Sequence, residues 1–96
     1  MYKYYYVYIL TNARNKRFYV GITNEIARRT WEHKYYWINS YCRRLRINKL
    51  VYYEVYEDVL VAINREKRLK RWYRRWKIEL INSFNPEWKD LYQDVV

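Results

Sequence analysis

The sequence predicts a small α+β domain in which helices flank a three-stranded antiparallel sheet. The 96 residues suffice for one domain, because a second independent core needs roughly 50 residues of its own. Three short runs are rich in β-branched and aromatic residues, and the stretches after the second and third have helical spacing. The predicted order is β-β-α-β-α-α, which is typical of helices packed on one small sheet. We expect a single domain over residues 1–96 with its core at about 4–83.

The first two strands are expected to pair as a hairpin. Residues 4–10 read YYYVYIL and residues 17–22 read RFYVGI, and the connection between them is polar. Because side chains alternate between the faces of a strand, the apolar residues of both runs share one face. Tyr8, Tyr19 and Gly21 then share the other face. Two tyrosine hydroxyls are therefore expected beside the only glycine of the chain.

Spacing and capping residues predict the remaining elements. One strand and four helices are expected, over residues 49–55 and over residues 25–34, 59–73, 74–83 and 86–92 respectively. Thr23 or Asn24 can cap the first helix and Asp58 the second. Asn85 followed by Pro86 predicts the start of the last. Residues 35–45 have no clear period, so we expect a loop or a short helix there.

The composition indicates a polyanionic partner. Lys and Arg total 20 against 10 Asp and Glu, a net charge of +10. A protein this basic is attracted to polyanions, of which nucleic acid is the commonest. Anionic lipid or ribosomal RNA fits the charge equally well, and a solvated surface is the simplest alternative.

Cysteine usage and hydropathy bear on location. The lone Cys42 excludes an intramolecular disulfide and a thiol-rich metal cluster. The apolar run at residues 4–10 is far shorter than the roughly 20 residues that span a bilayer. We therefore expect a cytoplasmic protein without a membrane partner.

Glu66 is the first candidate for chemistry. The apolar stripe of the predicted helix at 59–73 consists of Val59, Ala62, Ile63, Leu69 and Tyr73. Glu66 lies in the middle of this stripe, where a buried carboxylate is unfavourable without a cation. It pairs with Arg65, Lys67 or Lys70, or it binds Mg²⁺, which often takes one or two protein carboxylates.

Basic residues give further candidates. In the helix at 25–34, Arg29 and His33 lie one turn apart, so their side chains can converge, although a lone histidine is also a common packing residue. The predicted nucleic-acid contacts are Arg28, Lys34, Arg65, Lys67, Lys70, Arg71, Arg74 and Arg75. Trp72, Tyr73 and Trp76 interrupt this basic run, a pattern that suits phosphate contact with stacking but is also common on solvated surfaces. The sequence has no nucleophilic triad, glycine-rich phosphate loop or zinc spacing.

These elements together resemble the GIY-YIG nuclease domain. Residues 6–8 (YVY) and 19–21 (YVG) stand at the positions of the two tripeptides that name it, with Tyr8 and Tyr19 eleven residues apart. Arg29 stands at the position of the family's arginine, and residues 62–72 resemble the segment that supplies its metal-binding glutamate. The ending NPEWKDLY is similar to that of the short stand-alone bacterial members (the YhbQ type). The resemblance covers nearly the whole chain.

The resemblance implies an endonuclease that hydrolyses DNA with one divalent metal, Mg²⁺ or Mn²⁺, bound by Glu66. It implies a catalytic set that consists of Tyr8, Tyr19, Arg29, His33 and Glu66. A motif tyrosine would act as the base, and Gly21 would let backbone or phosphate approach closely. Structure-selective or weakly sequence-specific cleavage in DNA repair or processing is expected, because the chain lacks the separate DNA-binding domain of some relatives.

Two departures from the family pattern matter. Tyr6 replaces the glycine that opens the first tripeptide, and Ile22 stands where some relatives carry a lysine. Two alternatives also stay open, a non-catalytic nucleic-acid-binding module and a subunit that needs a protein partner. Exposed Trp31, Trp37 and Trp76 would favour the second alternative. Among nucleic acids we expect DNA rather than RNA, bound by a monomer or weak dimer.

Overall fold

A computed structural model describes residues 3–36 and 39–96 and confirms the predicted α+β fold. The three strands are β1 (Tyr5–Thr11), β2 (Phe18–Thr23) and β3 (Lys49–Tyr56). The sheet has the order β2-β1-β3, and both strand pairs are antiparallel. The helices are α1 (Ile26–Tyr35), α2 (Ser40–Leu45), α3 (Val59–Arg71), α4 (Arg74–Phe84) and α5 (Tyr92–Val95). None of the helices in the described parts of the chain has the length and apolarity needed to cross a bilayer.

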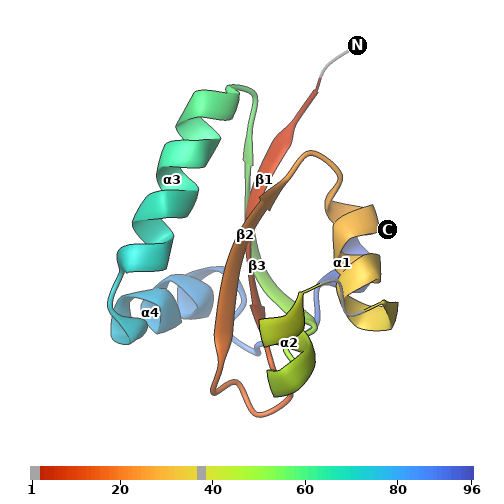
Figure 1. The fold of residues 1–96 in the computed structure, drawn as a ribbon. Coiled ribbons are helices and arrows are strands. Elements are labelled where there is room, and N and C mark those ends of the chain that lie inside the picture. Colours follow the sequence, from red (N-terminus) through yellow and green to blue (C-terminus); the bar gives the residue numbers. More distant parts are fainter. Residues whose placement is uncertain (1–2, 37–38) are drawn as a thin grey trace.

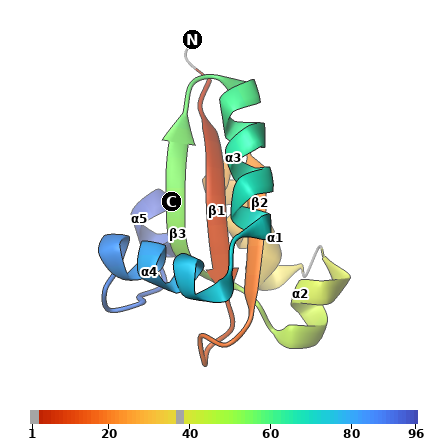
Figure 2. The same cartoon turned by 90° about the vertical axis from the view of Figure 1, so that its left-hand side faces the viewer.

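Helices cover both faces of the sheet. Figures 1 and 2 show α3 and α4 on one face, and α1 and α2 on the other. The core on the α3 side includes Val7, Ile9, Val20, Ala62, Leu69 and Ile81. The core on the α1 side includes Tyr8, Leu10, Ile26, Cys42 and Leu91. The predicted alternation of the hairpin therefore holds, and it places Tyr8 and Tyr19 on the face that α1 covers.

Side-chain hydrogen bonds define how α1 and α3 begin. The Asp58 carboxylate accepts from the backbone N–H of Leu60 at 2.8 Å, as expected of the predicted cap. Thr23 Oγ1 accepts from Glu25 N at 3.0 Å, which organises the turn just before α1. The expectation that Thr23 or Asn24 caps this helix is wrong, because the capping position of α1 is taken by Glu25, whose side chain makes no capping hydrogen bond.

Helix α3 ends at Arg71, two residues before the predicted end at Tyr73. Trp72 and Tyr73 have extended backbones between α3 and α4, and the Tyr73 side chain is 64% exposed. Val59 is exposed as well, so the predicted apolar stripe is wrong at both ends. Its central members Ala62, Glu66 and Leu69 are buried.

The last helix also differs from the prediction over residues 86–92, because α5 forms only at Tyr92–Val95. Asn85 follows α4 instead of capping a helix, and it is buried. Its Nδ2 donates to the Val51 carbonyl at 3.1 Å and to the Lys89 carbonyl at 2.8 Å. The side chain thus fastens the C-terminal segment to β3, and its Oδ1 accepts from Lys89 N at 3.1 Å in that segment instead of capping a helix.

Candidate active site

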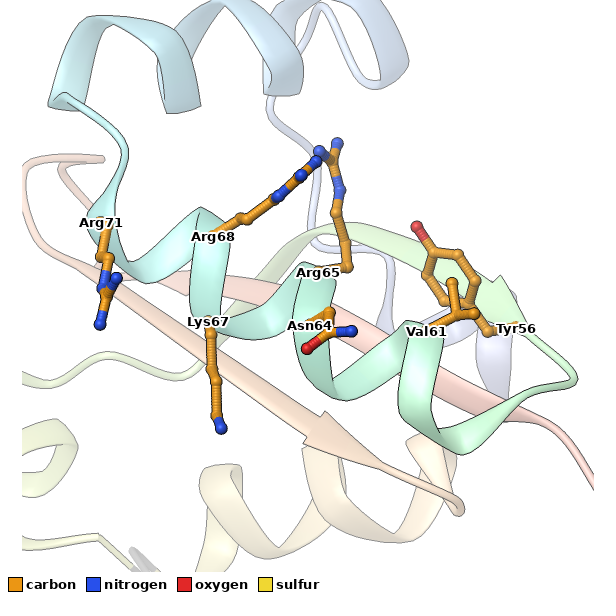
Figure 3. A pocket seen from close by; sticks show the side chains of 7 residues that line it. All are labelled: Tyr56, Val61, Asn64, Arg65, Lys67, Arg68 and Arg71. Carbon is orange, nitrogen blue, oxygen red and sulfur yellow. The ribbon is translucent and has the colours of Figure 1, made fainter.

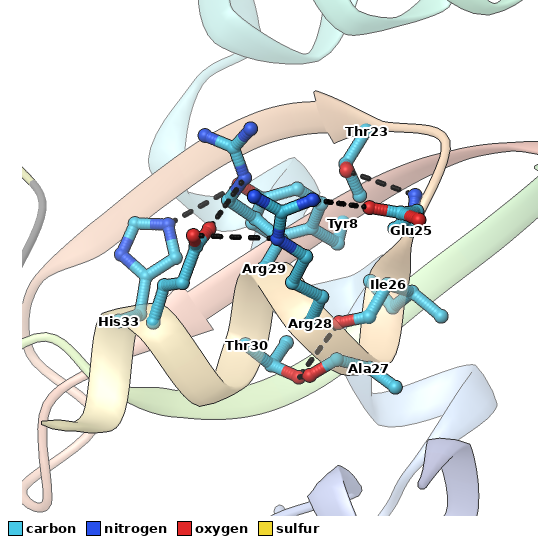
Figure 4. A network of polar contacts seen from close by, with 10 residues as sticks. Tyr8, Thr23, Glu25, Ile26, Ala27, Arg28, Arg29, Thr30 and His33 are labelled. Atoms are coloured by element: carbon cyan, nitrogen blue, oxygen red, sulfur yellow. Dashed lines mark hydrogen bonds and ion pairs between the residues drawn. The ribbon is translucent and has the colours of Figure 1, made fainter. Parts of the chain in front are cut away.

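Tyr8, Tyr19 and His33 form an aromatic cluster where α1 packs on the hairpin. The ring centroids of Tyr8 and Tyr19 are 6.4 Å apart, and that of His33 lies 6.0 Å from Tyr8 and 5.4 Å from Tyr19. Tyr8 Oη is 3.3 Å from His33 Nε2, within hydrogen-bond distance (Figure 4). Three residues from β1, β2 and α1 therefore meet at one point.

Gly21 makes room for this cluster. It is the cross-strand partner of Tyr8, whose phenol lies over it. A Cβ at this position would stand 2.4 Å from Tyr8 Oη and 2.5 Å from Cζ, closer than any van der Waals contact. The expectation from the sequence was close approach of backbone or phosphate, whereas the neighbour found here is the tyrosine itself.

His33 is neutral at pH 7. Its side chain is 1% exposed, and burial lowers its pKa to about 4, with further lowering by the positive charge of Arg29. Glu32 acts in the opposite direction. His33 Nδ1 is buried without a hydrogen-bond partner among the described residues, which leaves one polar atom of the cluster unsatisfied.

The Tyr8 phenol is protonated at pH 7. Burial raises its pKa above the ordinary value of 10, and interaction with Tyr19 raises it further. The positive charge of Arg29 lowers it, and the negative charge of Glu66 adds a smaller increase. Two residues from helices on opposite faces of the sheet thus act electrostatically on one phenol.

Arg29 lies at the exposed side of the cluster (Figure 4). Its Nε is 3.5 Å from Glu32 Oε1, and its side chain is nearly half exposed. The adjacent Arg28 pairs with Glu25 at 3.0 Å and with Glu32 at 3.6 Å. Both arginines can therefore exchange a weak surface ion pair for an incoming anion.

Glu66 lies on α3, on the face of the sheet opposite α1 (Figure 1). It lies on α3 between Ala62 and Leu69, and its side chain is 12% exposed. Its Oε2 contacts Lys70 Nζ at 2.6 Å, so the ion pair that the sequence left open forms with Lys70. The electrostatic effect on Tyr8 links this carboxylate to the aromatic cluster.

The donor set near Glu66 fits a hard divalent cation held by few protein ligands. No group of three or more His, Cys, Asp or Glu side chains able to hold a metal occurs within residues 3–36 and 39–96. Mg²⁺ commonly binds one or two carboxylates and keeps water and phosphate oxygens in its other positions. The Glu66 carboxylate, 12% exposed, could supply one such ligand once Lys70 moves aside.

A cationic surface runs along α3. A hollow of about 670 Å³ is lined by Tyr56 of β3 and by six residues of α3, four of them basic (Figure 3). Of these four, Lys67, Arg68 and Arg71 are exposed and have no ion-pair partner in the described part of the chain. They remain available for phosphate contact.

The other predicted nucleic-acid contacts differ in their surroundings. Arg74 and Arg75 lie over aromatic rings, at 4.7 Å from the centroid of Phe18 and 5.6 Å from that of Tyr73. Lys34 is mostly buried, donates to the Asn48 carbonyl at 3.1 Å and pairs with Asp90. It therefore tethers the C-terminal segment to α1, and its ammonium is already used within the fold.

Arg65 is also engaged within the fold, in a network that the sequence did not reveal. Its guanidinium donates to both carboxylate oxygens of Glu54, at 2.9 and 2.8 Å. Tyr52 and Tyr56 hydroxyls donate to the same carboxylate. Burial alone would raise the pKa of Glu54, but these hydrogen bonds outweigh it and lower the pKa. The spacing of Tyr52, Glu54 and Tyr56 at alternate strand positions was the available signal.

Two of the three tryptophans considered as partner contacts are partly exposed. Trp31 is 41% exposed and Trp76 is 40% exposed. Trp76 packs edge-on against Tyr73, with ring centroids 4.8 Å apart. Trp37 lies outside the described residues.

Residues 4–79 match the family model of the GIY-YIG catalytic domain, which covers most of the chain and both strands of the site. The chain belongs to the GIY-YIG family. Curated relatives include UPF0213 proteins of Clostridium perfringens, 36% identical over 78 residues, and of Syntrophus aciditrophicus, 36% identical over 85 residues. The first alignment covers 81% of this chain and 83% of the relative, and the second covers 85% and 93%.

A solved structure shows the same fold. The solution NMR structure of a UPF0213 protein from Bacillus halodurans superimposes with a TM-score of 0.57 at 26% identity, covering 91% of this chain and 92% of that one. GIY-YIG proteins form a nuclease superfamily whose members generally use divalent metals. The family therefore agrees with the resemblance carried by Tyr8, Tyr19 and Gly21.

Proposed function

We propose that this GIY-YIG protein is a divalent-metal-dependent endonuclease that hydrolyses phosphodiester bonds in DNA. The observation that carries the proposal is the buried Tyr8 phenol, which contacts His33 and lies within the electrostatic influence of Arg29 and, more weakly, of Glu66. His33 lies within hydrogen-bond distance of it, Arg29 lowers its pKa, and Glu66 acts on it from the other side of the sheet. A binding module needs no such arrangement, because phosphate contact alone requires only positive charge.

Glu66 would hold the metal, Mg²⁺ or Mn²⁺, through its carboxylate. When bound, the metal would supply a Lewis acid for a phosphoryl oxygen and would lower the pKa of a bound water. Arg29, on the exposed side of the same site, would bind another phosphoryl oxygen and stabilise the negative charge that develops during cleavage. Replacing its weak surface ion pair with Glu32 by a contact to phosphate would cost little free energy.

Proton transfer would involve the two motif tyrosines and His33. Because the pKa of the Tyr8 phenol is raised, the phenol would first have to lose its own proton, for which His33 Nε2 at 3.3 Å is the neighbouring acceptor, before its phenolate could take a proton from water. Nearby positive charge favours that loss. Arg29 already acts in that direction. His33 is neutral and orients the Tyr8 hydroxyl at 3.3 Å. Tyr19 packs beside both and is the second candidate for the base.

The cationic surface of α3 and the start of α4 would bind the DNA backbone. The groups that we assign to it are Lys67, Arg68, Arg71, Arg74 and Arg75. Contacts from such side chains to phosphates position a substrate but do not read its sequence. We therefore propose structure-selective or weakly sequence-specific cleavage, in DNA repair or processing in the cytoplasm. Lys34 and Arg65 are left out of this surface because the fold uses their charges.

The test is a cleavage assay on single-stranded, duplex and branched DNA with Mg²⁺ or Mn²⁺. We expect cutting that stops with EDTA and returns when metal is added back. A panel of unrelated sequences in each structure separates structure selectivity from sequence specificity. Salt-sensitive binding without cutting of any substrate would contradict the proposal and favour the non-catalytic or partner-dependent alternative.

A further inference from the structure

We propose that Lys70 couples metal binding to nucleic-acid binding. In the free protein its ammonium forms an ion pair with the Glu66 carboxylate, and it releases this carboxylate when it pairs with a phosphate of the nucleic acid. This inference rests on the proposed function, in which Glu66 holds the metal and α3 contacts the backbone. It concerns the order in which the two ligands bind, which the proposed function leaves open.

Lys70 contacts the mostly buried Glu66 carboxylate from a more exposed position on the same helix. Its Nζ contacts Glu66 Oε2 at 2.6 Å from one helical turn away. The Glu66 side chain is 12% exposed, whereas that of Lys70 is 53% exposed. The carboxylate is thus largely buried, while about half of the lysine side chain is accessible to solvent and to an anion that binds there.

Lys70 is distinguished from the other cations of α3 by this contact. Arg65 pairs instead with Glu54 of β3. Lys67, Arg68 and Arg71 have no carboxylate partner in the described ranges 3–36 and 39–96. Among the described residues, Lys70 is therefore the only basic side chain that forms an ion pair with the proposed metal ligand.

Competition for the carboxylate has a thermodynamic consequence. An ammonium in contact with Glu66 repels a divalent cation that approaches the same oxygens. A nucleic-acid phosphate offers Lys70 an alternative ion pair, which frees Glu66. Because coupling between two ligands is reciprocal, bound metal must then strengthen nucleic-acid binding by the same factor. The protein would bind metal weakly until its substrate arrives.

The experiment measures Mn²⁺ affinity by electron paramagnetic resonance, with and without a phosphorothioate oligonucleotide that resists cleavage. Lys70→Met removes the charge and keeps the length of the side chain. We expect it to bind Mn²⁺ about five-fold more tightly than the wild type without the oligonucleotide. The oligonucleotide should strengthen Mn²⁺ binding by the wild type and have a much smaller effect on Lys70→Met.

Two variants complete the design. Lys16→Met removes the same charge from an exposed position in the β1–β2 connection, outside the proposed site and DNA surface, and its Mn²⁺ affinity should stay near that of the wild type. Glu66→Gln gives the background from Mn²⁺ on the oligonucleotide itself. If Lys70→Met behaves like Lys16→Met, the role of Lys70 is wrong while the metal site stands. If Glu66→Gln binds Mn²⁺ as well as the wild type, the proposed metal site itself is wrong.

Discussion

The phenol of Tyr8 lies over Gly21 of the neighbouring strand, where no Cβ can be accommodated. The glycine therefore determines where the tyrosine hydroxyl stands, and through it the contact with His33. The geometry of the site and the pairing of β1 with β2 therefore depend on the same cross-strand pair, Tyr8 and Gly21.

Gly21→Ala should destabilise the protein through overlap with Tyr8. Placing a methyl group in a packed site typically costs about 1–3 kcal/mol of unfolding free energy. The same substitution in a Tyr8→Ala background should cost much less, because the colliding ring is gone. Urea unfolding of the four proteins measures the coupling. Equal costs in both backgrounds would show that the phenol does not lie over the glycine.

His33 should make stability depend on pH. Its folded pKa of about 4 lies below the ordinary value of 6.5, because burial and Arg29 disfavour the charged form. Between these values the unfolded chain binds a proton that the folded protein does not. Stability therefore falls as the pH decreases from 6.5 to 4, by about 3 kcal/mol in total.

The control for this pH dependence is His33→Gln, which cannot titrate. Unfolding free energies of both proteins should be measured between pH 4 and 7. The stability of the wild type should decline more steeply as the pH falls, because only the wild type has the His33 side chain that titrates. Other titrating groups, Glu54 among them, are present in both proteins and contribute equally to both curves. Parallel curves would contradict the buried neutral state of His33.

The Glu54–Arg65 pair should stabilise the attachment of α3 to β3. Glu54→Gln leaves a partly buried guanidinium without its counter-charge, and we expect a loss of about 2 kcal/mol. Adding Arg65→Met to this variant should restore part of the loss, because the unpaired charge is removed. Thermal unfolding provides the measurement. A double variant whose loss equals the sum of the two single losses would rule out a direct interaction.

Arg71→Ala and Arg75→Ala should weaken DNA binding and reduce its salt dependence. Each loses about one phosphate contact, so the slope of log affinity against log salt should become shallower by about 1. The control is Arg14→Ala in the exposed β1–β2 turn, where the slope should stay unchanged. Fluorescence anisotropy with labelled duplex at several salt concentrations gives these slopes. An unchanged slope for both Arg71→Ala and Arg75→Ala would show that these two arginines do not contact the DNA backbone.

Much of the fold followed from local patterns. Alternation in the hairpin correctly placed Tyr8 and Tyr19 on one face, because the period of a strand is strict. Asp58 was found as a cap from its chemistry alone. The structure of the C-terminal segment was not predicted correctly, because Asn85 donates a hydrogen bond to Val51 of β3. This partner is 34 residues away in the sequence, so no local pattern encodes the contact.

The candidate site was predictable only in part. Spacing brought Arg29 and His33 to one helix face, but burial of His33 and exposure of Arg29 depend on how α1 tilts on the sheet. Lys34 and Arg65 looked like the other basic residues of the sequence. Their carboxylate partners, Asp90 and Glu54, are distant in sequence, so tertiary structure was needed to show that these charges are used internally.

The most direct test of the central claim is Glu66→Gln, measured for cleavage and for binding on the same DNA. Removing the carboxylate takes away the proposed metal ligand and leaves every cation of α3 in place. We predict that metal-dependent cleavage falls by at least about 100-fold, because metal catalysis contributes several kcal/mol. The affinity for a phosphorothioate copy of the same DNA, compared in saturating Mn²⁺ where residue 66 no longer holds Lys70 in either protein, should stay within about two-fold of the wild type. Undiminished cleavage by purified Glu66→Gln would show that the active site lies elsewhere.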